Sequence, residues 1–519
     1  MRWRRVVLFS SLGASLLGGY YAFPESGLSR LCRSAGTASM ILYDYKTSTF
    51  MQPEDLRIWR ECHIRSAKRL VALAERNGGL YIKVGQGFAV MNHLLPPEYC
   101  AEMAVLQNDV RKRPYADIAR VIREDFKRPV EEIFVEFEKE PLAAASMAQV
   151  HRATLRDENT GTMHRVAVKV QYPDVAGRFE GDLGTIQMLS KCAGIAFPGF
   201  DFSGIMQRVR GTLYAELDFL QECANNDKCG EHMRAYFPKG DVIVPKVFYN
   251  ASSHRVMTTQ YIDHAFKVND VYNITQKLRF STSTVAKLFI DAFAVQIFRT
   301  GFVHADPHPG NVLVRQHPDG KHRPQLIILD HGLYTTLSEK DRGDFAEVWR
   351  CVALEQDDGL KTVLKKTWGI DNYYLFATVM MQRPYKNICW YTKKPLATPH
   401  GKLNPDEVNI MRRFVLESMA ETTEMLKVLP MELTWLLRNL NTVRAVHFEL
   451  GGPVNRLARM TIMAIDGSVD LAGWRRSWVK VMAMCKITWE LWLDTWKLFL
   501  LKRYYPQVYQ ELMEFQVIA

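Results

Sequence analysis

The sequence lacks several features that would assign a protein class at once. It has no cysteine pair at CxxC spacing, no internal repeat and no low-complexity segment. Its nine cysteines are dispersed, and the closest two, Cys223 and Cys229, are six residues apart. An odd, scattered set indicates reduced thiols rather than a disulfide framework or a zinc site. The sequence also has no basic helix interleaved with aromatic residues. Nucleic acid is therefore the least favoured partner for a chain with a net charge of +11, after an anionic membrane or a mitochondrial address.

Long apolar runs are scarce as well, and the N-terminal one is ambiguous. Residues 6–23 form an uncharged run of 18 residues, preceded by the basic start MRWRR and followed by Pro24. Such a run can be a secretory signal, a membrane anchor or a mitochondrial presequence. No clear small-x-small cleavage signal follows it, and three glycines make it a mediocre spanning helix. We assign residues 1–28 to targeting or to a possible membrane segment.

The remaining chain is long enough for one large core or two ordinary cores, because it has 519 residues, of which 47% are hydrophobic. The pattern predicts a helical extension over 29–128, short strands from about residue 130, and helices again after Gly332. Residues 401–519 form a helical C-terminal part whose last section is rich in tryptophan and lysine. Most of that section is predicted to be core, and a basic amphipathic helix on a membrane surface is the alternative.

The most informative stretch is residues 302–332. Asp306 and Asn311 lie five residues apart, and two apolar runs follow, the second ending on Asp330-His331-Gly332. Two β-type runs around a polar turn predict a hairpin that brings Asp306, Asn311 and Asp330 to one end. Such a set of hard oxygen ligands suits Mg²⁺ bound to nucleotide phosphates. The spacing matches the catalytic loop and the metal-binding element of protein kinases. The alternative is a polar loop beside a structural hairpin, in which Asp, Asn and Gly are turn residues.

A second group of candidates lies upstream. Val166–Gln171 alternates around Lys169 as a strand would, and Val-Ala-Val-Lys is the kinase pattern whose lysine contacts the α- and β-phosphates. A lone strand lysine is otherwise an ordinary solvated edge residue. Before it, the small residues Ala143, Ala144, Ala145 and Ser146 allow a backbone to approach a phosphate closely. Alanine does not adopt positive φ angles as freely as glycine, so this turn should be stiffer than a glycine-rich loop and differently shaped.

Three further segments complete the candidates. Residues Leu213 to Glu222 are predicted to form a helix that carries Glu216, Asp218 and Glu222. An ordinary charged helix face is the alternative explanation. Glu222 is a candidate partner for Lys169 only if this helix packs on the strand that bears Lys169. Lys83 and Gln86 are three residues apart and share one helical face. Taken alone, their segment is better explained as a helix whose glycines allow a close contact. Residues 255–262 predict a strand, and residues 281–301 predict an amphipathic helix that leads into the Asp306 loop.

These motifs occur together in one known family. They are Lys83-x-Gly85-Gln86, the Ala143–His151 segment, Val-Ala-Val-Lys169, Glu216-Leu-Asp218, His304-Ala-Asp306-Pro-His-Pro-Gly-Asn311 and Asp330-His-Gly332. In this order, over about residues 50–450, the sequence resembles the UbiB family of atypical kinases, also called AarF-domain-containing kinases or ADCK. Within it, the sequence most resembles the mitochondrial subgroup that contains the first ADCK protein of animals.

The resemblance implies an α+β, kinase-like bilobal fold with a helical N-terminal extension and a largely helical C-terminal region. The N-lobe would span 129–262 and the catalytic part of the C-lobe 263–400. Lys169 would hold ATP or ADP phosphates and pair with Glu222, Asp306 would be the catalytic aspartate, and Asn311 and Asp330 would hold Mg²⁺. Ala143–Ser146 would replace the glycine loop, and Glu216 would lie near the metal and nucleotide. Lys83 and Gln86 would belong to the extension that covers the peptide site.

The resemblance also suggests a function. It implies an ATPase or atypical kinase acting in mitochondrial lipid or coenzyme Q homeostasis, on a lipid or quinone-like small molecule rather than a peptide. A mitochondrial location agrees with the scattered thiols, and the secretory pathway is the alternative. A nucleotide-gated scaffold with little turnover and a true protein kinase remain alternative functions. Two features depart from ordinary kinases, namely His331 in place of a phenylalanine and an inserted element at about 175–212 whose role the sequence does not indicate.

Overall fold

The computed structural model describes residues 26–51, 56–89, 96–107, 112–157, 160–196, 210–211, 214, 216–381, 385, 421, 425, 428–468, 474, 477–483, 485, 496 and 503–504. The chain divides into two compact units. The first comprises residues 1–220 and 247–261, and the second comprises residues 221–246 and 262–519. Each unit contains part of the predicted site, so we describe them in turn. The 6–23 run and most of the tryptophan-rich end lie outside the described residues.

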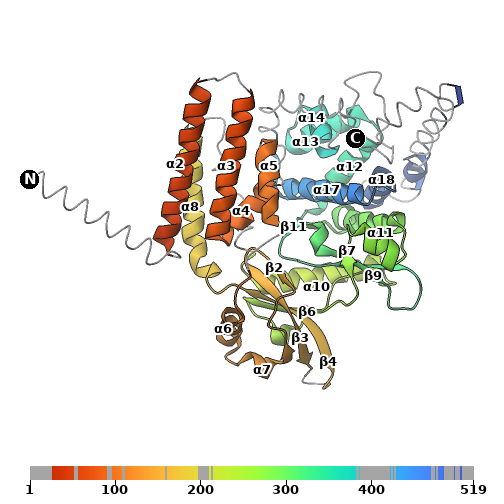
Figure 1. Ribbon diagram of the computed structural model, residues 1–519. Coiled ribbons are helices and arrows are strands. Elements are labelled where there is room, and N and C mark those ends of the chain that lie inside the picture. The colour runs from red at the N-terminus through yellow and green to blue at the C-terminus, as the bar shows by residue number, and fades with distance from the viewer. Residues whose placement is uncertain are drawn as a thin grey trace, which may run out of the picture. The chain divides into compact units, whose positions relative to one another are not determined.

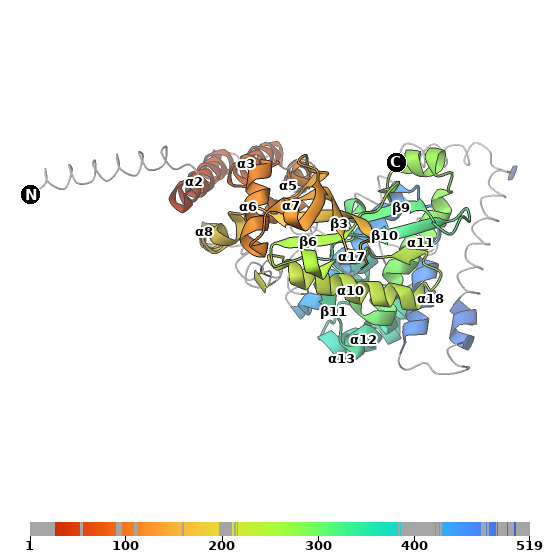
Figure 2. The same cartoon turned by 90° about the horizontal axis from the view of Figure 1, so that it is seen from below.

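The first unit begins with a group of helices. They are α2 (Gly27–Met51), α3 (Leu56–Asn77), α4 (Leu80–Ala89), α5 (Pro97–Met103), the short η1 (Ala104–Gln107) and α8 (Val175–Ala196). Helices α2 and α3 lie side by side, and α8 packs along α2 and α4 (Figures 1 and 2). Helix α8 is most of the inserted element noted in the sequence. Its role in this fold is to complete the N-terminal helical group.

A buried ion pair fastens this group together. The Nε of Arg30 on α2 donates to Asp182 Oδ1 on α8 at 2.8 Å, and a second guanidinium nitrogen contacts Asp182 Oδ2. The third nitrogen donates to the carbonyl of Asn77 at the end of α3. The Arg30 and Asp182 side chains are only 3% and 7% exposed. The pair therefore joins three helices that are distant in sequence.

The second part of the first unit is an antiparallel sheet. Its strands are β1 (Phe134–Phe137), β2 (Ala143–Ala144), β3 (Ala148–Arg156), β4 (Met163–Gln171) and β6 (Val256–Gln260), in the order β1-β3-β4-β6 with β2 paired to β3. Val166, Val168 and Val170 are fully buried at alternate positions of β4, as expected for a strand with one core face. Helices α6 (Tyr115–Phe126) and α7 (Val130–Ile133) contribute to this core. The strands predicted at 166–171 and 255–262 are confirmed.

The prediction of one helix over 213–222 was wrong. Residues 216 and 217 form a turn, and helix α10 (Phe219–Tyr236) begins only at Phe219. The reason is local, because the Asp218 carboxylate accepts the backbone N–H of Leu220 at 3.0 Å and so caps the new helix. Glu216 therefore lies in a turn, whereas Glu222 lies in the first part of α10.

The second unit contains two small sheets. Strands β5 (Val242–Ile243), β10 (Pro324–Ile328), β9 (Val312–Gln316) and β7 (Phe266–Lys267) form the first, and β8 (Phe302–His304) pairs with β11 (Tyr334–Thr336) in the second. Antiparallel pairing of Val312 with Ile328 confirms the predicted hairpin. The backbone N–H of Leu329 donates to the carbonyl of Asn311 at 2.7 Å, so Asn311 and the segment that leads to Asp330 meet at one end.

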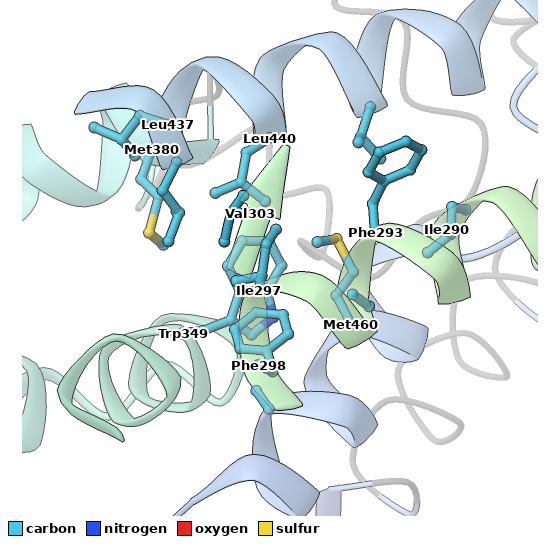
Figure 3. Packing of buried hydrophobic residues seen from close by; sticks show 14 of the residues in the cluster. Ile290, Phe293, Ile297, Phe298, Val303, Trp349, Met380, Leu437, Leu440 and Met460 are labelled. Atoms are coloured by element: carbon cyan, nitrogen blue, oxygen red, sulfur yellow. The ribbon is translucent and has the colours of Figure 1, made fainter. Parts of the chain in front are cut away.

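Helices enclose the core of the second unit. They are α11 (Thr282–Val295), α12 (Glu339–Ala353), α13 (Asp357–Trp368), α14 (Tyr373–Met381), α17 (Met431–Glu449) and α18 (Arg456–Gly467), with the short helices η3 (Asn273–Lys277), η4 (Gln296–Thr300) and η5 (Pro309–Asn311). The short helix η2 (Tyr249–Ala251) belongs to the first unit. Figure 3 shows side chains of α11, α12, α17, α18 and β8 meeting in this core. Ser281 caps α11, and Gly301, with φ of 66°, ends the helical run directly before β8. The helix predicted to lead into the Asp306 loop is thus confirmed, with a π-helical last turn.

The helices and the mainly antiparallel sheets, in which only β5 and β10 pair in parallel among the described strands, confirm the predicted α+β class. Within the described residues, every cysteine is unbonded and no helix is both long and apolar enough to span a membrane.

Candidate functional site

The Asp306 loop is held by backbone hydrogen bonds in the second unit. The N–H of Asp306 donates to His304 Nδ1 at 3.0 Å, and the carbonyl of Asp306 accepts the N–H of His308 at 2.8 Å and the Asn311 amide at 3.3 Å. Burial lowers the pKa of His304, so its ring stays neutral and its Nδ1 remains an acceptor. The backbone N–H of His304 is itself held by the buried side chain of Gln296. These hydrogen bonds fix the backbone at His304 and Asp306, so the position of the Asp306 side chain is well defined.

Acidic groups gather around Gly332 in the same unit. A methyl group at Gly332 would lie 3.5 Å from Asp330 Oδ1 and 3.7 Å from Glu222 Oε2. Asp330 itself has φ of 55°, a left-handed conformation that is uncommon outside glycine and is found at functional sites. Together with the Asn311 amide, these carboxylates are oxygen donors of the kind that Mg²⁺ takes. By donor chemistry these residues are compatible with a magnesium ion, and glycine leaves space beside the two carboxylates.

His331 has a structural role that differs from that of a phenylalanine. It is buried, with Nε2 3.1 Å from the carbonyl of Ile328 and Nδ1 2.9 Å from the hydroxyl of Tyr334. Burial raises the pKa of Tyr334, so its hydroxyl stays protonated and can donate to Nδ1. The backbone carbonyl of His331 accepts from Asn225 on α10 at 3.0 Å. Polar contacts, together with stacking of the His331 ring on the Tyr334 ring, position this turn.

The sequence did not indicate two candidate functional residues, and both lie on α17. Arg438 Nη2 is 3.2 Å from Asp306 Oδ2, with the two side chains 25% and 33% exposed. The neighbouring Asn439 is fully buried and its amide donates to the carbonyl of His304 at 2.6 Å. The available signal was weak, namely the polar pair Arg438-Asn439 directly after the apolar run Trp435-Leu436-Leu437.

The first unit positions Lys169 on β4. Lys169 pairs in register with Val150 and Met257, and its side chain is half-buried on the face opposite Val168 and Val170. Its ammonium lies 5.1 Å from the centre of the Phe219 ring. This contact places the cation beside Phe219, which belongs to the same unit. Because Lys169 belongs to the first unit and Glu222 to the second, their pairing stays a prediction.

The alanine-rich segment forms a tight antiparallel turn. Ala143 and Ala144 pair with Val150 and Gln149, and the N–H of Ala145 donates to the carbonyl of Ala148 at 2.7 Å. None of the four residues 143–146 has a positive φ, in agreement with the expected difference from a glycine loop. Ser146 is buried, whereas Ala143 and Ala145 are exposed. How this segment meets a phosphate stays a prediction.

Lys83 and Gln86 make different contacts within the first unit. Lys83 Nζ lies 2.8 Å from Glu216 Oε2, and these side chains are 27% and 9% exposed. Gln86 donates to the backbone carbonyl of Leu106 at 2.9 Å. Gly85 lies against the same residue, since an added Cβ would be 2.4 Å from Leu106 Cδ1. The motif thus combines a close helix contact with an ion pair that joins two sequence-predicted site residues.

The buried side chains of Gln149 and His151 connect strand β3 to neighbouring segments through hydrogen bonds. The side chain of Gln149 accepts the N–H of Arg113 at 2.9 Å and donates to its carbonyl at 3.2 Å. It also lies 2.9 Å from His151 Nε2, while His151 Nδ1 lies 2.8 Å from the carbonyl of Glu138. Burial lowers the pKa of His151. These motif residues fasten the segment before α6 to the sheet.

Comparison with known proteins identifies the family of this chain. The model of the ABC1 atypical kinase-like domain matches residues 105–364. The chain belongs to this family. It is 32% identical to AarF domain-containing protein kinase 1 of Xenopus laevis, covering 86% of this chain and 83% of that one, and 31% identical to AarF domain-containing kinase 1 of Drosophila melanogaster, covering 97% and 96%.

A relative from Dictyostelium discoideum, named probable serine/threonine-protein kinase abkD, is 34% identical over 86% of this chain. The chain spans only 62% of that relative's length. The family and its kinase-like fold are therefore established for this protein, as the motifs predicted.

Proposed function

We propose that this protein is a Mg²⁺-dependent, ATP-binding atypical kinase or ATPase. The observation that carries the proposal lies in the second unit. The Asn311 amide binds the Asp306 carbonyl at one end of the hairpin, and the backbone of Asn311 pairs with Leu329, directly before Asp330. Asp330 and Glu222 in turn flank Gly332. Asp330 and Asn311 would hold Mg²⁺, which neutralises phosphate charge when bound. Lys169 would hold the α- and β-phosphates. Phosphoryl transfer requires mainly positioning and charge neutralisation, and these residues supply both.

We further propose a lipid or quinone-like small molecule as the acceptor or partner. Helix α4, which carries Lys83 and Gln86, is fastened to Glu216 and Leu106 within a built helical group. The family resemblance implies that this extension covers the site where a protein kinase receives its peptide, which favours a small ligand over an extended peptide. A role in mitochondrial lipid or coenzyme Q homeostasis is consistent with this ligand class and with the basic N-terminal segment.

An exposed aromatic face supports association with a membrane surface. Trp474 is 75% exposed, and Trp478, Val481 and Met482 are also exposed at spacings that place them on one side of a helix. Lys480, between them, pairs with Asp466 of α18 at 2.6 Å. Tryptophan on one face with basic residues nearby is typical of helices that lie in a lipid interface.

A nucleotide-gated scaffold is the second candidate function. The observation in its favour is that the Lys83–Glu216 ion pair and the stiff alanine turn both restrain groups expected near the nucleotide. In that case nucleotide binding, rather than turnover, would be the signal that a partner detects.

The experiment supplies radiolabelled MgATP to the full chain, with vesicles of neutral or anionic lipid and with a peptide mixture. The proposal predicts nucleotide turnover that rises with anionic vesicles and is lost in Asp306→Asn, with no label on peptides. Tight nucleotide binding without turnover under every condition would support the scaffold. Peptide labelling that depends on Asp306 would instead identify a protein kinase.

A further inference from the structure

Helix α17 contacts the catalytic loop at two successive residues. Arg438 reaches the Asp306 carboxylate, and Asn439 donates to the carbonyl of His304, which lies 135 positions earlier in the chain. Both contacts lie within the second unit. Residues 438 and 439 are also beyond the segment that the family model matches. The loop is therefore attached to a helix outside the matched domain.

The Arg438 side chain is held in place on its own helix. Its guanidinium carbon lies 5.5 Å from the centre of the Trp435 ring, one turn earlier. Asn439 is fully buried beside it, which fixes the rotation of α17 about its axis. An arginine supported in this way loses little conformational entropy when it binds a carboxylate. The Asp306 pair is consequently a better defined contact than an ordinary surface ion pair.

We propose that Arg438 is a positioning residue for Asp306 and balances its charge. This inference rests on the proposed function, in which Asp306 faces a nucleoside triphosphate. With Arg438 present, the carboxylate is compensated and oriented. Without it, a negative charge would face incoming phosphates and the side chain would be free to turn. Arg438 acts on the nucleotide through Asp306 and makes no contact with phosphate itself.

The test is a double-mutant cycle on nucleotide binding, measured with a fluorescent, non-hydrolysable ATP analogue and Mg²⁺. Arg438→Gln should weaken binding about fivefold, the effect of one uncompensated charge at a partly exposed site. Arg438→Lys retains the charge but lacks the guanidinium that packs on Trp435, so it should weaken binding less than Arg438→Gln. In the Asp306→Asn background, residue 306 carries no charge for Arg438 to balance. Arg438→Gln should therefore change binding by less than about twofold in this background.

The matched control is Arg444→Gln on the same helix. Arg444 lies over the Phe448 ring, with 6.0 Å from its guanidinium carbon to the ring centre, and its substitution should leave nucleotide binding unchanged. If Arg444→Gln weakened binding equally, α17 would have only a structural role. If Arg438→Gln weakened binding equally in both backgrounds, the arginine would contact phosphate directly. Either result would overturn the inference.

Turnover separates this inference from the proposed function. If wild-type protein binds nucleotide and does not turn it over, the enzyme proposal fails, while the binding cycle still decides the role of Arg438. If wild-type protein turns over ATP, Arg438→Gln should lower kcat about tenfold or more through a misplaced Asp306. If wild-type protein binds no nucleotide, both proposals fail. If binding and turnover are present and Arg438→Gln matches wild type in both, only the inference fails.

Discussion

The buried ion pair of the first unit gives the sharpest stability prediction. Arg30→Met removes the cation from Asp182 and the donor from the Asn77 carbonyl, while keeping much of the apolar volume. Because both charged groups are more than nine-tenths buried, the loss should resemble that of a broken buried pair, about 3–5 kcal/mol. The unpaired carbonyl adds about 1 kcal/mol. Together these are a large part of the stability of an ordinary domain, which is about 5–15 kcal/mol.

The double variant Arg30→Met/Asp182→Leu is the matched control. It removes both charges and should lie within about 1 kcal/mol of wild type, since well-packed apolar residues often replace such pairs at no cost. The assay is amide hydrogen exchange of α2 and α8, with urea unfolding as a second measure, because the two units need not unfold together.

The pH dependence of this variant provides an independent check. Burial raises the pKa of Asp182 even with Arg30 present. Without Arg30, the folded state should favour the protonated acid more strongly, so the loss in Arg30→Met should shrink as pH falls. A loss below about 1 kcal/mol that does not vary with pH would refute the reasoning.

Three further predictions concern the site. Asp330→Asn should abolish the Mg²⁺-dependent part of nucleotide affinity; titration with and without EDTA measures it, and unchanged affinity would contradict the metal assignment. Lys83→Met leaves the Glu216 carboxylate without its cation, so amide exchange in α4 should become faster. The double variant Lys83→Met/Glu216→Gln should restore slow exchange. Equal exchange rates in the two variants would argue against the ion pair. Burial lowers the pKa of His304 in the folded state, so the folded protein favours the neutral ring. The stability that this preference contributes is fully present above the unfolded-state pKa of about 6.5, and it is lost as the pH falls from there toward the lower folded-state pKa. Urea midpoints from pH 8 to pH 5 should fall less in His304→Gln than in wild type, and an identical fall would show that His304 does not titrate as proposed.

The sequence predicted those parts of the site that are local in the chain. The hairpin of β9 and β10 follows from two apolar runs around a polar turn, and it places Asn311 beside the segment before Asp330. The strand bearing Lys169 follows from its alternation. In each case neighbouring residues specify the geometry, so a pattern within one short window is sufficient.

The remaining contacts depend on tertiary packing. The Arg438–Asp306 pair joins an α17 residue to a distant loop, and no spacing rule relates their positions. The Lys83–Glu216 pair is similar, because the sequence assigned both residues to the site without indicating that they touch. The start of α10 was misplaced for a local reason, since Asp218 continued a charged helical pattern and its capping role was overlooked.

The most direct test of the central claim is release of the γ-phosphate from MgATP by the full chain, compared with Asp306→Asn. The account predicts turnover in the wild type that requires Mg²⁺ and falls by at least about a hundredfold in the variant, in which the loop retains its backbone hydrogen bonds. Equal turnover in the two proteins would contradict the account, because the activity would then arise from a group other than the Asp306 loop.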